Sequence, residues 1–210
     1  SGAYAGPDFV SAFGLLPPAF LPVGNRRLYE LHAELTASIE SRKLLSIPND
    51  FEIEDHEQER LSSLGFELIP GKTGISLGES IAQALDTASA TSGELRILHG
   101  DTYMFALPLN ETDIVSEGKS SEYYSWAEYR VTQSGGIEFF DGLMAGKSSA
   151  RGGERRVLAG YFCFKEMDLY RKTLEDSEHQ FIPSLNAYSK LRPIQPVPTD
   201  RWLDFGHLDR

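Results

Sequence analysis

The sequence predicts an α/β fold with a mostly parallel, mixed sheet. Short apolar runs of strand length alternate with amphipathic runs of helix length, which is typical of βαβ units. One such run, Leu95–Leu98, stops at Gly100 and Asp101, which places a carboxylate at the tip of a strand. Ligands of open α/β sheets collect beyond the carboxyl ends of the strands, so Asp101 is a candidate ligand for Mg²⁺. An isolated Gly-Asp pair is more often only a turn, and the rest of the chain has to decide.

The composition narrows the class of protein. The chain has 210 residues, 40 % of them hydrophobic and 24 % charged, which is ordinary for a globular protein of one large domain with a core or at most two small ones. A net charge of −11 argues against non-specific binding to nucleic acid or to anionic membranes. No apolar run approaches the roughly 20 residues that span a bilayer, so we expect no membrane insertion. The single cysteine, Cys163, excludes an intramolecular disulfide, fits a cytoplasmic protein and reads as a buried core residue.

The first segments of the chain combine glycine and proline. Residues 1–7 (SGAYAGP) can bring backbone N–H groups close to a phosphate, although a glycine-rich terminus is more often only a chain end. The proline-spaced stretch 17–27 is predicted to be neither helix nor regular strand. Apolar residues then follow with the spacing of one helix face: Leu28, Leu31, Leu35 and Ile39.

Alternating strands and helices follow up to Asp101. We expect strands over 43–48, 66–70 and 95–98, an acidic surface helix over 53–64, and a glycine-containing loop over 71–78. That loop leads into a helix whose inner face carries Leu77, Ile81, Leu85 and Ala88. The strand over 95–98 is expected to be the centre of the sheet.

The second half is richer in aromatic residues. Residues 123–132 and 137–140 are separated by Gly135 and Gly136, which predicts a hairpin. A strand over 157–164 and a helix over 167–174 follow, and a proline-spaced stretch leads to Trp202–Gly206. We expect one domain over 1–210, with a nucleotide-binding half over 1–120 and a sugar- or acceptor-binding half over 121–210.

Six segments, taken in order, resemble the motifs of sugar-phosphate nucleotidyltransferases (sugar-nucleotide pyrophosphorylases), as a divergent member of the type found in capsule and surface-polysaccharide biosynthesis. They are the glycine-rich loop Ser1–Gly6, the segment Phe20–Gly24 (FLPVG), the loop and helix Ser76–Leu85, the strand end Leu98–Asp101 (LHGD), the strand Ala159–Phe164 (AGYFCF) and Trp202–Gly206 (WLDFG). Each motif alone is weak, whereas the order and spacing of all six are specific.

The resemblance implies a three-layer, Rossmann-like domain and a reaction. A sugar phosphate or related metabolite would attack the α-phosphorus of a nucleoside triphosphate and release pyrophosphate, with Mg²⁺, or Mn²⁺ instead, as the cofactor. It implies the following roles: Asp101 and Asp204 as metal ligands and catalytic residues, Gly2, Ala3, Gly6, Gly78 and Gly100 at the nucleotide, and Asp141, Gly160 and Tyr161 at the sugar. A homo-oligomer is a further expectation.

The chain departs from the family pattern where cations are expected. No arginine lies between Gly2 and Phe20, Pro18 stands where a lysine precedes the Pro-Leu-Leu-Pro segment, and the segment 140–143 contains no lysine. Arg26, Arg27, Lys72 or Arg201 could replace these cations, and we expect Arg26 to be the catalytic one. The family's first strand has no counterpart before Ser1, and the last residues read as the middle of a helix, so we expect a fragment of a longer protein.

Two other functions stay open. The missing cations favour a catalytically inactive module that binds a nucleotide or sugar nucleotide for regulation. A glycosyltransferase is less favoured, because the strand end reads Gly100-Asp101-Thr102-Tyr103 rather than Asp-x-Asp. Simpler readings also exist for single residues: Asp204 as a helix N-cap, and His99 as a hydrogen-bonded residue at a strand end.

Overall fold

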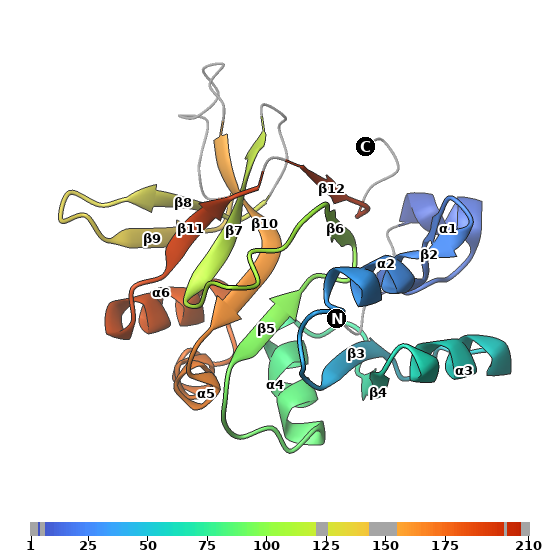
Figure 1. The fold of residues 1–210 in the computed structure, drawn as a ribbon. Helices are drawn as coiled ribbons and strands as arrows, with labels where there is room; N and C mark the ends of the chain where they lie inside the picture. The colour runs from blue at the N-terminus through green and yellow to red at the C-terminus, as the bar shows by residue number, and fades with distance from the viewer. Residues whose placement is uncertain (1–3, 5–6, 121–125, 143–154, 200, 207–210) are drawn as a thin grey trace. The chain divides into compact units, whose positions relative to one another are not determined.

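The computed structural model describes residues 4, 7–120, 126–142, 155–199 and 201–206, which form two compact units (Figure 1). The first unit comprises residues 1–90, 99–107 and 202–210, and the second comprises 91–98 and 108–201. Both units combine helices with strands, which confirms the α/β class. The single domain over 1–210 stays a prediction. No helix among the described residues is both long and apolar enough to cross a membrane.

The first unit contains most of the N-terminal half. Its helices are α1 (Pro7–Phe13), the short 3-10 helix η1 (Pro18–Phe20), α2 (Leu28–Leu35), α3 (Asp55–Ser63) and α4 (Leu77–Thr87). Its strands are β1 (Pro22–Val23), β2 (Arg26–Arg27), β3 (Lys43–Pro48), β4 (Phe66–Gly71), β6 (Thr102–Met104) and β12 (Trp202–Asp204). Strands β3 and β4 pair in parallel around the crossover helix α3, as the alternation of elements predicted.

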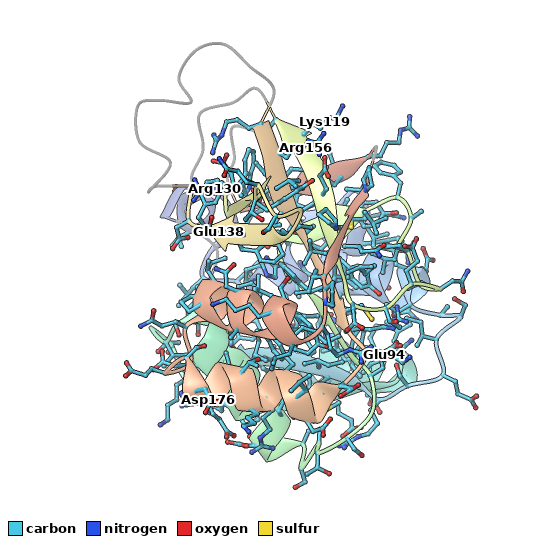
Figure 2. All side chains as sticks on the ribbon, turned by 90° about the vertical axis from the view of Figure 1, so that its left-hand side faces the viewer. Glu94, Lys119, Arg130, Glu138, Arg156 and Asp176 are labelled. Carbon is cyan, nitrogen blue, oxygen red and sulfur yellow. The ribbon has the colours of Figure 1, made fainter. Side chains whose placement is uncertain are left out.

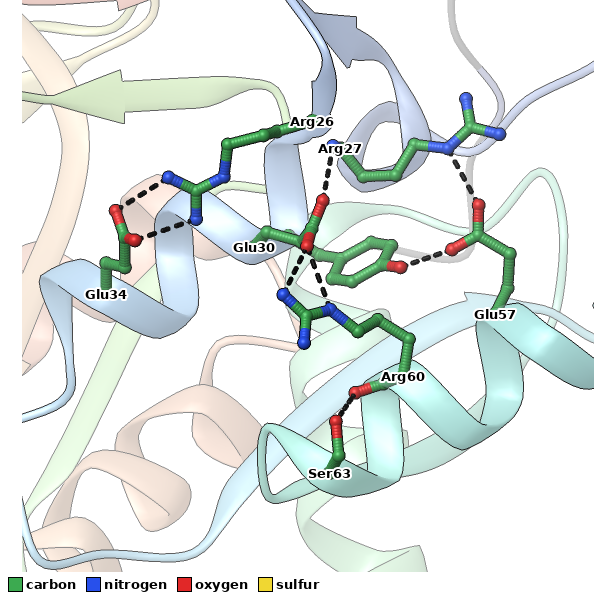
Figure 3. A network of polar contacts seen from close by, with 8 residues as sticks. Arg26, Arg27, Glu30, Glu34, Glu57, Arg60 and Ser63 are labelled. Carbon is green, nitrogen blue, oxygen red and sulfur yellow. Dashed lines mark hydrogen bonds and ion pairs between the residues drawn. The ribbon is translucent and has the colours of Figure 1, made fainter.

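The core of the first unit joins β3 and α3 of this crossover to η1 and α2. Phe20, Tyr29 and Leu61 are at most 2 % exposed and bring η1, α2 and α3 together. Polar contacts tie the same elements at their edge, where Arg27 and Arg60 pair with Glu57 and Glu30 across α2 and α3 (Figure 3). The proline-spaced segment expected to be irregular forms η1 and a two-residue hairpin, β1–β2, whose turn contains Gly24 at a φ of +65°.

The second unit is built on a six-stranded sheet. Its strands are β5 (Leu95–Leu98), β7 (Ile114–Ser120), β8 (Glu128–Val131), β9 (Ile137–Phe140), β10 (Arg155–Phe164) and β11 (Gln195–Pro198). The order is β11-β7-β10-β8-β9, and β5 pairs with β10. The expected strand over 95–98 is therefore confirmed, but the prediction that it is the centre of the sheet is wrong: β10, which pairs with three strands, takes that place.

Pairing is more antiparallel than the alternation of elements indicated. Among the described strands only β3–β4 and β7–β11 pair in parallel. The sheet is mixed, as expected. In the second unit the only parallel pair among the described strands is β7–β11, and α5 and α6 connect β10 to β11. The β8–β9 hairpin, predicted from Gly135 and Gly136, pairs Val131 with Ile137 and carries the ion pair between Arg130 and Glu138 (Figure 2).

Two helices complete the second unit, α5 (Met167–Asp176) and α6 (Phe181–Leu191). They pack against each other, and Tyr170, stacked on Phe164 with ring centres 3.9 Å apart, joins α5 to β10. Asn186 of α6 exchanges two hydrogen bonds with the backbone of Phe139 in β9. Neither α6 nor β7 was expected from the sequence. Pro183 in the first turn of α6 resembles a helix breaker but is tolerated there, and β7 carries too many polar residues to read as a strand.

Candidate functional site

Two strand ends of the first unit bring Asp101 and Asp204 together. Strands β6 and β12 pair antiparallel with Asp204 opposite Thr102, the residue after Asp101. The backbone N–H of Phe205 donates to the carbonyl oxygen of Asp101 at 2.7 Å, which extends the pairing to the turn. The two aspartates are 103 positions apart in the sequence, and this short ladder makes them neighbours.

Both carboxylates approach the same glycine. A methyl group on Gly206 would lie 2.9 Å from Oδ1 of Asp204 and 3.3 Å from Oδ2 of Asp101, so the two oxygens flank the position that a side chain would occupy. The N–H of Gly206 also donates to Oδ1 of Asp204 at 2.7 Å and fixes that carboxylate. Asp204 therefore ends a strand and caps a turn; it is not the N-cap of any helix in the described part of the chain.

The chemistry of this pair suits a hard cation shared with a substrate. In the described ranges no cluster of three or more His, Cys, Asp or Glu side chains could enclose a metal, so a structural metal centre has no donor set here. Mg²⁺ is commonly held by one or two carboxylates and completes its shell with substrate phosphates and water. Two carboxylates that converge at one glycine fit that pattern.

Two histidines of the first unit lie close to the pair. Burial lowers the pKa of His99, while the carboxylates of Asp101 and Asp204 act in the opposite direction. His32, on α2, is 6 % exposed, and its Nε2 lies 2.7 Å from the carbonyl oxygen of Thr102. Burial also lowers the pKa of His32, more than the Thr102 carbonyl and the Asp101 carboxylate raise it. Both rings are therefore neutral near pH 7.

The glycines expected at the nucleotide are placed only in part. Gly2, Ala3 and Gly6 lie outside the described residues. Gly100 packs on η1, where a methyl group would meet Ala19 at ordinary contact distances of 3.8–3.9 Å, so space does not require a glycine there. Gly78 is buried in the first turn of α4, two residues after the N-cap Ser76, which confirms its expected place at a loop-to-helix junction.

Arg26 does not point to the aspartate pair in its described contacts. Its guanidinium forms a hydrogen bond and an ion pair, each at 2.9 Å, with the carboxylate of Glu34 on α2 (Figure 3). That hydrogen-bonded carboxylate raises the pKa of Arg26 further. Arg26 as a catalytic cation stays a prediction, and this role would require it to leave Glu34.

The three residues expected at the sugar all belong to the second unit. Asp141 is exposed directly after β9. Gly160 has a φ of +90° at an irregularity of the β7–β10 pairing, a conformation that favours glycine. Tyr161 is 1 % exposed, Arg96 donates a hydrogen bond to its hydroxyl, and burial raises its pKa to about 12. Its ring is thus part of the core, and its backbone N–H and carbonyl oxygen both hydrogen-bond to the Ser116 hydroxyl, so its contact with a sugar stays a prediction.

Three residues of the site region had no role in the sequence analysis: His32, Thr102 and Gly206. Gly206 was part of the Trp202–Gly206 motif, and the position of both carboxylates beside it was the missing information. His32 gave no signal, because a single histidine on an apolar helix face reads as a core residue.

Comparisons with known proteins place the fold. No protein-family model matches the chain, and no curated protein sequence matches it. Solved structures do. The nucleoside-diphosphate-sugar pyrophosphorylase of Vibrio cholerae is 14 % identical over 99 % of this chain and 95 % of its own, with a TM-score of 0.71. A UDP-glucose pyrophosphorylase complexed with UDP-glucose is 12 % identical, and the CTP:phosphocholine cytidylyltransferase of Streptococcus pneumoniae is 10 % identical; each match covers 99 % and 92 % of the two chains at a TM-score of 0.67.

These likenesses show that the chain has the Rossmann-like fold of the nucleotidyltransferases. Identities of 10–15 % carry no more than the fold.

Proposed function

We propose that the chain is a nucleotidyltransferase, which transfers a nucleoside monophosphate from a nucleoside triphosphate to a phosphorylated acceptor and releases pyrophosphate. The observation that carries the proposal is the convergence of the Asp101 and Asp204 carboxylates at Gly206. This pair lies on a fold that pyrophosphorylases and a cytidylyltransferase share. Fold alone would not argue for an activity, whereas a carboxylate pair suited to Mg²⁺ on that fold does.

The reaction needs positioning and charge neutralisation rather than a protein nucleophile. A phosphate oxygen of the acceptor attacks the α-phosphorus, and the bond from that phosphorus to the oxygen bridging the β-phosphate breaks, so that pyrophosphate leaves with the electron pair. Asp101 and Asp204 would hold Mg²⁺, or Mn²⁺, which when bound draws charge from the phosphate oxygens. The N–H of Gly206 donates a hydrogen bond to the Asp204 carboxylate and fixes its orientation. Gly78 and the residues around Gly2, Ala3 and Gly6 would bind the nucleotide.

The acceptor is proposed to be a sugar phosphate or a similar small phosphorylated metabolite. The solved structures above include both a nucleoside-diphosphate-sugar enzyme and a phosphocholine enzyme, so the fold accommodates acceptors that differ beyond the phosphate. Asp141 and Gly160 would face the acceptor. A role in surface-polysaccharide synthesis in the cytoplasm, and assembly with a second copy of the chain, belong to the same proposal.

A nucleotide-binding module without catalysis is the second candidate. It is favoured by the pairing of Arg26 with Glu34, which leaves the cation we chose for the site engaged elsewhere. Such a module would bind nucleotide and metal at Asp101 and Asp204 but would release no pyrophosphate from any acceptor.

A pyrophosphate-release screen separates these candidates. The protein is incubated with each of the four ribonucleoside triphosphates, Mg²⁺, and a panel of hexose 1-phosphates and phosphocholine. We expect release with one nucleotide and one acceptor class, and loss of release in Asp101→Asn and Asp204→Asn. Leu203→Ala, on the exposed side of β12, is the control that should retain it. No release with any pair, together with measurable nucleotide binding, would leave the binding module.

A further inference from the structure

Asp101 lies in the turn His99–Thr102, in which the Thr102 N–H donates a hydrogen bond of 3.2 Å to the His99 carbonyl oxygen. Neighbouring elements contact this turn from two sides. On one side, β12 contributes the hydrogen bond from Phe205 N–H to the Asp101 carbonyl. On the other side, no described strand pairs with β6, and His32 of α2 lies there instead, with Nε2 2.7 Å from the Thr102 carbonyl oxygen. Thr102 is 4 % exposed, so this carbonyl has little access to water. A helix side chain thus satisfies a buried group that a neighbouring strand would satisfy in a wider sheet.

The protonation of His32 follows from its partner. A carbonyl oxygen can only accept, so Nε2 must carry the hydrogen and donate it. Because burial keeps the ring neutral, Nδ1 carries none, and the ring is held in one tautomer. The donor is fixed in direction by its position on α2 (Leu28–Leu35), a helix of the same unit as the turn.

We propose that His32 is a positioning residue for the metal ligands: its Nε2–H holds the Thr102 carbonyl and thereby fixes the turn His99–Thr102, so that the Asp101 carboxylate faces Asp204. This rests on the proposed function of the aspartate pair. His32 would not touch metal or substrate. It acts through the backbone next to Asp101, as outer-shell partners of metal ligands commonly do.

Three substitutions separate this role from ordinary core packing. His32→Gln places an amide N–H at about the reach of Nε2 and should preserve the contact. His32→Leu fills a similar volume without a donor. His56→Leu, an exposed histidine of α3 in the same unit, is the matched control for loss of a histidine.

Two measurements are made on the full chain. Hydrogen exchange reports the Thr102 and Phe205 amides without metal, and calorimetric titration with Mn²⁺ alone reports metal affinity. In His32→Leu we expect exchange at these amides to accelerate about tenfold and Mn²⁺ affinity to fall roughly tenfold, within the range for outer-shell partners of metal ligands. His32→Gln should stay near the unsubstituted protein in both, and His56→Leu should change neither.

The remaining outcomes overturn the proposal. Unchanged exchange and affinity in His32→Leu would show that the contact positions nothing. Faster exchange throughout the first unit, not rescued by His32→Gln, would show a packing role. If His32→Leu loosens the turn but the unsubstituted protein binds no Mn²⁺, the proposed metal function fails and so does the role of His32 in it. If metal binds and only the effect of His32 is absent, the proposed function stands and this inference falls.

Discussion

At the scale of single residues, Gly206 lies where the two carboxylates converge. A methyl group there would lie within 2.9 Å of Asp204 Oδ1 and 3.3 Å of Asp101 Oδ2, closer than an alkyl carbon and an oxygen normally approach. In Gly206→Ala the carboxylates must turn away, while the backbone stays as it is. We expect Mn²⁺ affinity to fall roughly tenfold or more, and the melting temperature without metal to change little.

Calorimetric titration and thermal melting of Gly206→Ala check this expectation. Leu203→Ala is the control, since it shortens an exposed side chain of the same β12 strand. Unchanged affinity in Gly206→Ala would mean that the metal, if bound, lies elsewhere.

Sequence reasoning reached the two aspartates but not what surrounds them. Asp101 was visible as a carboxylate at a strand end, and Asp204 entered only through the resemblance of Trp202–Gly206 to a family motif. The neighbourhood of Gly206 and the contact from His32 depend on pairings between positions far apart in the chain. No local pattern records such pairings.

At the scale of elements, an ion network fastens α3 to the start of α2 (Figure 3). Glu57, which is 8 % exposed, accepts hydrogen bonds from Nε of Arg27 at 2.8 Å and from the Tyr29 hydroxyl. Glu57→Gln removes the charge that Arg27 faces. We expect it to lower the free energy of unfolding by about 2 kcal/mol, below the cost at a fully buried pair because the Arg27 side chain is 36 % exposed.

A more exposed ion pair nearby is the control for Glu57→Gln. Glu34 of α2 pairs with Arg26, but the Glu34 side chain is 65 % exposed. Urea unfolding of Glu34→Gln should show a clearly smaller loss than Glu57→Gln, because water screens such an exposed pair. Equal losses in the two variants would contradict the importance of burial in this network.

A hydrogen-bonded cluster around Asp113 connects α6 to the rest of the second unit and makes the stability of the fold depend on pH. Asp113 accepts hydrogen bonds from Arg192, from the Tyr188 hydroxyl and from the backbone N–H of Lys165. Burial alone would raise the pKa of Asp113, but these donors outweigh it, and the pKa is lowered. A lowered pKa contributes stability that is present above the unfolded value of about 3.9 and is lost as pH falls through the folded value.

Asp113→Asn tests the contribution of the Asp113 charge. Asparagine readily adopts the positive φ of 54° at this position, so the substitution should not strain the backbone. We expect the variant to be less stable than the unsubstituted protein at pH 7, and the difference to shrink as the pH falls below about 4. Urea unfolding of both proteins at pH 7 and at acidic pH gives the result. A difference that stays constant with pH would mean that the charge of Asp113 contributes nothing.

At the scale of the whole molecule, the class of fold could be predicted from the sequence and the pairing of strands could not. The strands at 43–48 and 66–70, and the helix after Ser76, stand out through apolar periodicity and capping residues. Strand β10 pairs antiparallel with β5 and β7, which joins segments that are 35 or more residues apart in the sequence. No local sequence pattern predicts this pairing. The order of the six family-like motifs compensated for this, because it implied the fold directly.

The central claim is that Asp101 and Asp204 hold one metal ion together, and a double-mutant cycle tests it most directly. The rise in melting temperature on adding Mn²⁺ is measured for the unsubstituted protein, Asp101→Asn, Asp204→Asn and the double variant. Two ligands of one ion act as a unit, so each single substitution should abolish the rise and the double variant should lose nothing further. A rise that survives in either single variant, or losses that add, would contradict the shared site.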